Sequence, residues 1–231
     1  ERVVGFHFFN PVAVMPLLEI VKGEQTDDAT LATAFATGKA LKKTTILVKD
    51  SPSFIANRLL GRFMGEFSKI VDEGTPVEVA NEGIAGLPPM PPLVLVGLVG
   101  PAIALHNSET LHRELGERFY VSPNLKALVE AGKRSYDDEG VAELLTAPES
   151  PVELTAQQVR ERVLGVLAEE VRTMLDDGVA QAPMDIDLAM ITGAGFQFWN
   201  GGLTPLLDRE GVSEKVTGQR FLPKGVASVP A

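Results

Sequence analysis

A histidine and a glutamate near the start of the chain are the residues best suited to proton transfer. His7 lies in the run Gly-Phe-His-Phe-Phe-Asn-Pro, and Glu19 lies in Leu-Leu-Glu-Ile-Val. An ionised carboxylate among aliphatic side chains is costly unless a partner compensates its charge. A histidine paired with a carboxylate has its tautomer fixed and its charged form favoured, which makes it a competent general acid or base. The residues between them suffice to reverse the chain, so we predict that His7 and Glu19 form a catalytic pair.

Two asparagines are candidates for holding a carbonyl or hydroxyl group of a ligand. Asn10 follows the histidine run, and Asn57 lies early in a long segment with helical periodicity. Each also has a local explanation, because Asn10 can stabilise an Asn-Pro turn and Asn57 can hydrogen-bond within a first helical turn. Taken alone, the local explanation is the stronger one. His106 and His112 do not share a helix face, so we predict no metal site.

Composition limits the class of protein. The chain has 231 residues, of which 45% are hydrophobic and 23% charged, as in ordinary globular proteins. Its formal net charge of −10 opposes long-range attraction to nucleic acid or anionic membranes. The chain has no cysteine, which is consistent with a cytoplasmic location. The longest apolar stretch, 93–105, is broken by glycine and proline, so we predict no transmembrane segment.

The elements that must position His7 and Glu19 belong to an α/β arrangement. Apolar segments and one alanine-rich segment predict a strand, a strand, a helix and a strand over 3–9, 17–21, 28–41 and 45–48. Strands this apolar must be covered on both faces. The first strand starts almost at Glu1, which is not a methionine, so we expect a truncated or processed polypeptide.

From residue 50 onward the pattern is helical. Asp50-Ser51-Pro52 predicts a capped helix start, with the helix running from about Ser53 to Glu73. A proline-rich loop is expected over 88–92. Further helices are predicted over 102–116, 123–131 and 155–176, and the last of them opens with a capping box.

The two longest predicted helices resemble each other. Placing Arg58 on Arg162 aligns them without a gap, and Glu66 then falls on Glu170. The Asp-x-Gly ends of the two helices also coincide. We interpret this as a duplicated helical module. The aromatic segment 196–202 is expected to anchor the packing between modules rather than to contact a ligand.

The histidine and asparagine motifs resemble a known family. The run Gly-Phe-His-Phe-Phe-Asn-Pro-Val-Ala-Val-Met-Pro-Leu-Leu-Glu-Ile-Val strongly resembles the signature of L-3-hydroxyacyl-CoA dehydrogenases. The run Asp-Ser-Pro-Ser-Phe-Ile-Ala-Asn-Arg-Leu-Leu at 50–60 is similar to the entry into that family's helical C-terminal domain. The segment 184–202 resembles the second helical repeat of the multifunctional enzymes, in which an enoyl-CoA hydratase domain precedes the dehydrogenase. The resemblance covers nearly the whole chain.

The resemblance implies a mainly α fold with a definite domain order. Residues 1–49 would be the C-terminal remnant of a Rossmann NAD-binding layer. Residues 50–150 and 151–231 would be two tandem helical 3-hydroxyacyl-CoA dehydrogenase C-terminal modules. The duplication indicates the α-subunit of a multifunctional fatty-acid β-oxidation enzyme.

The resemblance also implies an activity and a role for each site residue. His7 would be the catalytic base in the NAD-dependent oxidation of L-3-hydroxyacyl-CoA to 3-ketoacyl-CoA, and Glu19 would orient it. Asn57 would hold the acyl-CoA substrate, and Asn10 would help to position the histidine region. A thiolase β-subunit is the implied partner, and the parent protein would be a homo- or hetero-oligomer.

The chain departs from the family pattern in three places, of which the first two limit what it does alone and the third is tolerable at a helix start. No Gly-x-Gly-x-x-Gly occurs, so the phosphate-binding turn for NAD is missing. The family's substrate-binding serine upstream of the histidine motif is also missing, and Ser53 stands where glycine is common. We expect the isolated chain to be inactive.

Two alternatives stay open. The chain could be a structural or oligomerisation segment of a β-oxidation complex, without catalysis. It could also belong to a dehydrogenase of a different hydroxy acid, since a fold alone does not fix the substrate.

Overall fold

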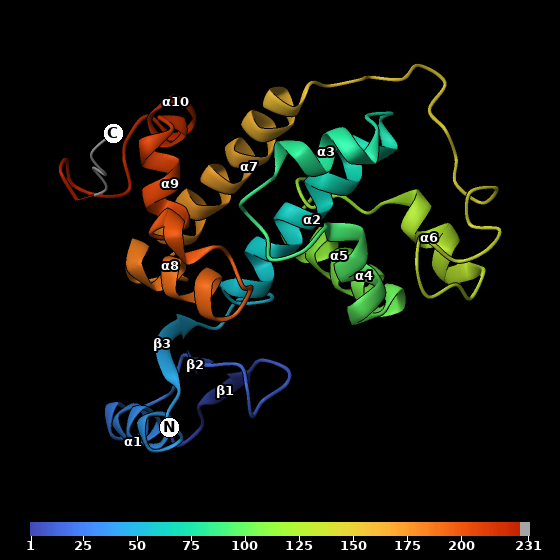
Figure 1. Ribbon diagram of the computed structural model, residues 1–231. Coiled ribbons are helices and arrows are strands. Elements are labelled where there is room, and N and C mark those ends of the chain that lie inside the picture. Colours follow the sequence, from blue (N-terminus) through green and yellow to red (C-terminus); the bar gives the residue numbers. More distant parts are fainter. Residues whose placement is uncertain (227–231) are drawn as a thin grey trace. The chain divides into compact units, whose positions relative to one another are not determined.

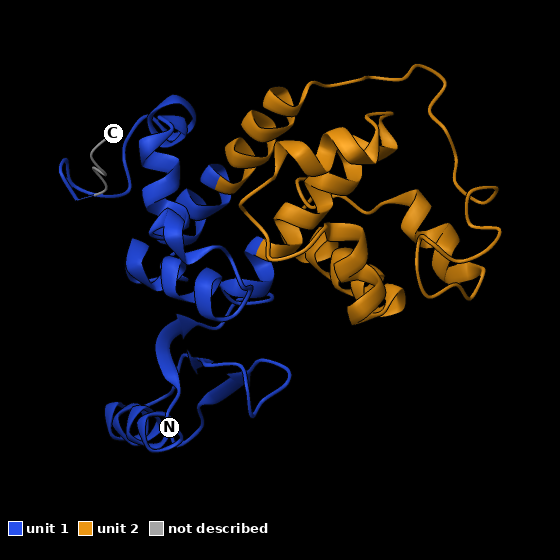
Figure 2. Ribbon diagram, in the orientation of Figure 1, with its two compact units in different colours: residues 1–59, 168–231 blue, residues 60–167 orange. Residues whose placement is uncertain are grey.

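The computed structural model describes residues 1–226, which form two compact units (Figures 1 and 2). Unit 1 combines residues 1–59 with the chain from Ala168 onward, and unit 2 comprises residues 60–167. Two long helices, α2 (Ala56–Asp72) and α7 (Ala156–Asp176), contribute residues to both units. The domain boundaries suggested by the sequence, after residues 49 and 150, do not coincide with these units and stay a proposal.

Unit 1 begins with a three-stranded sheet and one helix, as the sequence predicts. The elements in chain order are β1 (Gly5–Phe8), β2 (Leu17–Lys22), α1 (Asp28–Ala40) and β3 (Thr44–Lys49). The sheet order is β1-β2-β3, with β1 antiparallel and β3 parallel to β2. In this register His7 lies directly opposite Glu19, so both side chains are on the same face of the sheet.

Both faces of the sheet are covered, as such apolar strands require. On one face, Leu18 and Ile20 of β2 pack against Leu31 and Ala34 of α1. The other face contacts α8 (Pro183–Thr192), which packs on β2 and β3. Next to α8, Gly193 leaves no room for a side chain, because an added Cβ would lie 2.4 Å from Leu17 Cδ2.

The rest of the described part of unit 1 is mainly helical. After the last part of α7 and α8, the chain forms a 3-10 turn, η1 (Phe198–Asn200), and two short helices, α9 (Leu203–Arg209) and α10 (Val212–Thr217). The expected packing role for the aromatic segment is wrong for two of its rings. Phe198 is 70% exposed and Trp199 is 65% exposed, and only Phe196 is buried.

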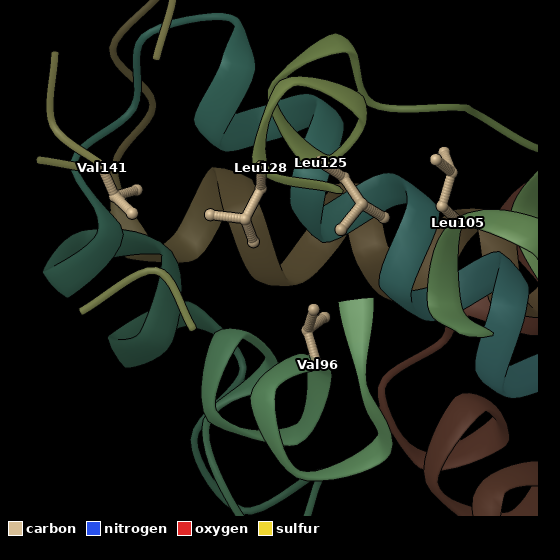
Figure 3. Packing of buried hydrophobic residues seen from close by; sticks show 5 residues of the cluster. All are labelled: Val96, Leu105, Leu125, Leu128 and Val141. Atoms are coloured by element: carbon tan, nitrogen blue, oxygen red, sulfur yellow. The ribbon is translucent and has the colours of Figure 1, made fainter. Parts of the chain in front are cut away.

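Unit 2 is built from helices around a small apolar core. Its elements, besides parts of α2 and α7, are α3 (Val77–Gly83), α4 (Pro92–Val99), α5 (Pro101–Leu115) and α6 (Pro123–Glu130). Figure 3 shows the core side chains Val96, Leu105, Leu125, Leu128 and Val141. The sequence predicts α5 and α6 but neither α3 nor α4.

Helix α4 is the clearest difference from the sequence-based expectation. Its run Pro-Leu-Val-Leu-Val-Gly-Leu-Val has no polar face, so it shows no helical periodicity. Gly100 ends it with φ +101°, and Pro101 starts α5 after a bend of 105°. Among the described residues, no single helix is long and apolar enough to cross a membrane.

The two long helices carry a reciprocal pair of ion pairs. In unit 1, Arg58 of α2 binds Glu170 of α7, and in unit 2, Arg162 of α7 binds Glu66 of α2. These are the residues that the sequence alignment superposes, arginine on arginine and glutamate on glutamate.

Candidate active site

The site is centred on the predicted pair of side chains. His7 Nδ1 lies 2.6 Å from Glu19 Oε2. The glutamate side chain is fully buried, whereas that of His7 remains 27% exposed. A buried carboxylate accepts the hydrogen bond, so Nδ1 carries the proton and the lone pair of the imidazole is left on Nε2. The predicted proximity is confirmed, and the catalytic role is treated below.

Glu19 has two further donors, both from the start of α2. Its Oε1 accepts hydrogen bonds from the backbone N–H of Ile55 (3.1 Å) and of Ala56 (3.0 Å). Backbone N–H groups at a helix N-terminus stabilise an anion. Three donors thus compensate a charge that would otherwise be costly to bury. Glu19 therefore joins three elements, because a β2 side chain binds β1 and caps α2.

The start of α2 differs from the sequence-based expectation. The helix begins at Ala56 rather than at Ser53, and its first amides are bound by Glu19 rather than by Asp50 or Ser51. The reason lies in the preceding backbone. Ser53 and Phe54 have φ values of +58° and +52°, in the left-handed region, which a right-handed helix cannot contain.

The left-handed segment places an aromatic ring beside the histidine. The ring of Phe54 lies 5.1 Å from that of His7, and the ring of Phe9 lies 4.7 Å away in an edge-on arrangement. These two contacts restrict the orientation of the imidazole. Sequence reasoning missed Phe54, although the glycine that is common at the preceding position in the resembling family was the available signal of a left-handed backbone.

A cleft of about 1130 Å³ in unit 1 gives access to the pair. His7 and Phe54 line it together with the N-terminal strand and the segment after β2. Lys22 and Lys49 are the cationic lining residues, and Asp50 is an anionic one. The cleft thus contacts the imidazole, while Glu19 is not among its lining residues.

The two asparagines have different relations to the pair. Asn57 follows Ala56 directly, so it belongs to the helical turn that caps Glu19, and it is partly exposed. Asn10 is exposed in the connection between β1 and β2. Neither side chain has a hydrogen-bond partner within residues 1–226. Asn57 is therefore next in the chain to a residue that binds Glu19. For Asn10, the described residues show no contact with His7 or Glu19.

Two polar contacts that sequence reasoning missed hold the segments around the site. Lys43 Nζ donates to the carbonyl oxygens of Val12 (2.5 Å) and Met15 (2.7 Å). Both acceptors lie in the connection between β1 and β2. Arg58, buried in the first turn of α2, binds Glu170 and also donates to Ser51 Oγ (3.2 Å). The sequence shows neither the Lys43 contacts nor the Arg58–Glu170 contact, because each joins residues at least 28 positions apart along the chain.

A cofactor or a metal would need its own binding groups beside the pair. The sequence of 231 residues contains no Gly-x-Gly-x-x-Gly run, which is the phosphate-binding turn of dinucleotide-binding folds. Within residues 1–226, no group of three or more His, Asp or Glu side chains is arranged to hold a metal ion. What the described residues supply is a proton-accepting imidazole in a cleft, oriented by a buried carboxylate. This is the arrangement of a general base.

Comparison with known proteins identifies the class to which this fold and site belong. Residues 1–51 match the NAD-binding domain of 3-hydroxyacyl-CoA dehydrogenases, and residues 54–142 match the C-terminal domain of the same enzymes. The chain belongs to the 3-hydroxyacyl-CoA dehydrogenase family, with the end of the NAD-binding domain followed by one C-terminal domain.

The particular relatives are alpha subunits of fatty acid oxidation complexes. The chain is 34% identical to the fatty acid oxidation complex subunit alpha of Vibrio parahaemolyticus and 29% identical to that of Acinetobacter baylyi, over 94% of its own length in each case. It spans about a third of these relatives, 33% and 34% of their lengths. Homology to the alpha subunit therefore extends over most of the chain.

Solved structures agree with this assignment. The fold is similar to that of 3-hydroxybutyryl-CoA dehydrogenase from Escherichia coli, with a TM-score of 0.72 and 19% identity, covering 98% of this chain and 70% of that one. The (S)-3-hydroxybutyryl-CoA dehydrogenase of Ralstonia eutropha is 36% identical with a TM-score of 0.52, covering 56% of this chain and 47% of that one.

Proposed function

We propose that this chain provides the proton-transfer half of an NAD-dependent L-3-hydroxyacyl-CoA dehydrogenase of fatty-acid β-oxidation. The single observation that carries the proposal is the 2.6 Å contact between His7 and a fully buried Glu19, at the wall of a cleft. His7 Nε2 takes the proton from the substrate 3-hydroxyl group during oxidation to the 3-ketoacyl-CoA. In the reverse reaction the same nitrogen returns the proton to the ketone oxygen.

The remaining residues of the site orient His7 or hold the substrate. Glu19 fixes the tautomer of His7 and stabilises the imidazolium that forms after proton transfer. Asn57 holds the substrate near the reacting carbon, and Asn10 helps to position the histidine region. NAD accepts the hydride when it is bound, and its pyrophosphate needs a phosphate-binding turn outside this chain. The isolated chain is therefore expected to be inactive.

The domain organisation that we propose has three parts. Residues 1–49 close the NAD-binding layer, and residues 50–150 and 151–231 are two tandem helical modules. The reciprocal ion pairs Arg58–Glu170 and Arg162–Glu66 support the duplication. By its similarity to fatty acid oxidation complex alpha subunits, the protein acts in the cytoplasm in an oligomer with a thiolase β-subunit.

The proposal is tested by following NADH oxidation with acetoacetyl-CoA. This chain alone is compared with the chain preceded by a dinucleotide-binding segment of the family. Turnover only in the extended form supports the proposal, and turnover in the isolated chain contradicts the expected inactivity. Turnover in neither form favours the structural alternative or a different hydroxy acid.

Replacing His7 tests the assigned base directly. His7→Ala in the extended form is expected to lower kcat by about 10²–10⁴-fold, since general-base catalysis contributes that much. The matched control is His112→Ala, because His112 Nδ1 interacts with the carbonyl oxygen of Phe119 and belongs to unit 2. Turnover of the His7 variant close to that of the wild type would sink the assignment.

A further inference from the structure

A buried ion pair connects the second half of α7 to the first turn of α2. Arg58 Nε and Nη2 each lie 2.6 Å from Glu170 Oε1, and both side chains are only 1% exposed. Breaking such a pair on one side leaves an uncompensated charge in the interior. Glu170 lies outside residues 1–51 and 54–142, which match the dehydrogenase domains.

Arg58 also holds the segment that shapes the site. Its Nη1 donates to Ser51 Oγ (3.2 Å), and the carbonyl oxygen of Ser51 accepts from Phe54 N (3.1 Å). Phe54 contacts the ring of His7. A continuous series of contacts therefore runs from Glu170 through Arg58 and Ser51 to the aromatic neighbour of the histidine.

Arg58 is also close in the chain to the amides that bind Glu19. It lies two residues after Ala56, whose amide binds Glu19, and one residue after Asn57. The direction of the first turn of α2 decides whether the two amides meet the Glu19 carboxylate. An ion pair that fixes Arg58 therefore fixes both the cap on Glu19 and the location of Asn57.

We propose that Glu170 is a positioning residue for the His7–Glu19 site, acting through Arg58. The proposal deepens the proposed function and rests on it for its catalytic consequence. It assigns the last third of the chain a role in the chemistry, because α7 delivers the carboxylate that holds the catalytic end of α2. Glu170 itself does not touch the reacting atoms.

The chain contains its own control. Arg162 and Glu66 form the equivalent pair in unit 2, with Nε and Oε1 2.5 Å apart. Arg162 also binds Glu73, and Glu66 also accepts from the buried Arg62 (3.2 Å), so the control loses more ion pairs than the test variant and is the more severe test of stability. Glu66 follows Arg58 by more than two turns along α2, beyond the amides that bind Glu19. The two pairs share residue types and helices, and only one of them is connected to the site.

The test removes both charges of each pair, because a single substitution would strand a buried charge and could unfold the protein. Replacing a buried ion pair by apolar residues of similar volume is often neutral for stability. The variants are R58M/E170L and the matched R162M/E66L. Both are made in the natural polypeptide with any residues that precede Glu1, and circular dichroism and urea unfolding verify that they fold.

The first readout is the kinetics of acetoacetyl-CoA reduction. R58M/E170L is expected to lower kcat by about 10–10²-fold with the KM for NADH unchanged, since small misplacements of reacting groups cost that much. R162M/E66L is expected to leave kcat within about twofold of the wild type. Equal losses of kcat in the two double variants would overturn the proposal.

The second readout does not depend on turnover. The hydrogen-bonded Nδ1 proton of His7 gives a downfield NMR signal, which R58M/E170L is expected to shift or broaden and R162M/E66L to leave in place. If the wild type does not reduce acetoacetyl-CoA, the proposed function fails while this signal still decides the positioning role. A signal that is unchanged in both variants overturns the proposal whatever the activity.

Discussion

Unit 1 contains two buried carboxylates that cap a helix from elsewhere in the chain, and they differ in one partner. Glu19 binds the first amides of α2, and Asp187 accepts from the amide (2.7 Å) and the hydroxyl (2.7 Å) of Thr204 at the start of α9. Glu19 is paired with His7, whereas burial raises the pKa of Asp187 from 3.8 to about 6, against the lowering effect of its Thr204 and Leu203 hydrogen bonds.

The comparison shows what the imidazole adds. Both carboxylates satisfy helix amides, and both helices are preceded by backbone with positive φ, at Ser53 and Phe54 before α2 and at Gly202 before α9. Asp187 stabilises the start of α9, but burial disfavours its charged form. With a histidine on the adjacent strand, the same arrangement gives the pair that we propose to act as an acid–base pair.

The largest expected effect comes from removing the charge of Glu19, the carboxylate that is paired with a histidine. Glu19→Gln keeps the size of the side chain but removes the anion that orients and stabilises His7. We expect kcat of the extended form to fall by about 10⁴-fold, as it does when the orienting aspartate of a Ser-His-Asp triad is neutralised. The control is Asp187→Asn, which is expected to leave kcat unchanged. Equal kcat losses in the two variants would mean that the two carboxylates do not differ in the way described.

The second effect is the pH dependence of stability that Asp187 introduces. Its folded pKa lies above the unfolded value, so its contribution to stability is full below pH 4 and is lost as the pH rises to about 6. The loss amounts to about 3 kcal/mol for a shift of this size. Urea unfolding at pH 4.5 and pH 7 should show a smaller pH dependence in Asp187→Asn than in the wild type. A difference between the two proteins that does not change with pH would contradict this prediction.

The third effect concerns the close approach of Asp187 to its helix. A Cβ on Gly202 would lie 2.5 Å from Asp187 Cγ, and the glycine has φ +122°. Gly202→Ala is therefore expected to lower the free energy of unfolding by roughly 2–3 kcal/mol, through backbone strain and displacement of Asp187. Gly201→Ala serves as control, because its added Cβ meets nothing closer than 3.6 Å and only the positive φ of +80° is penalised. Similar losses in thermal unfolding for both variants would exclude the clash as the cause.

The smallest expected effect concerns Ser53, which precedes the helix that Glu19 caps. Ser53 has φ +58°, where glycine is favoured over residues with a Cβ. Ser53→Gly is expected to raise the free energy of unfolding by about 1 kcal/mol, offset in part by the greater freedom of glycine in the unfolded chain. Ser53→Ala keeps the Cβ and should give no gain in chemical denaturation. A gain in both variants would point to the hydroxyl rather than to the backbone.

The parts that the sequence predicted are those that local patterns determine. The three strands and the helices α2 and α7 follow from periodicity, and the capping box at Thr155 and Gln158 is present. The pairing of His7 with Glu19 followed from the cost of an isolated buried charge, which is a local argument about one carboxylate.

The parts that the sequence did not predict depend on contacts between distant segments. The left-handed backbone at Ser53 is followed by two amides that bind Glu19, a residue of a distant strand. The alignment of Arg58 with Arg162, which we interpret as a repeat, does not reveal that each arginine binds the glutamate of the other helix. Helix α4 was missed because a helix that is apolar all round has no periodic signal.

The connection between β3 and the chain after α7 sets an order for folding during synthesis. The Lys49 amide donates to Val179 O (3.2 Å), Lys49 Nζ donates to Asp177 O (3.0 Å), and Val48 forms a bridge with Ala180. A ribosome that adds 5–20 residues per second makes this segment roughly 10–35 s after the histidine strand. Until then the edge of the sheet lacks its partner and exposes backbone groups that can pair with other chains. A chaperone would therefore be of most use during this interval, when the N-terminal sheet has been made and the segment 177–180 has not.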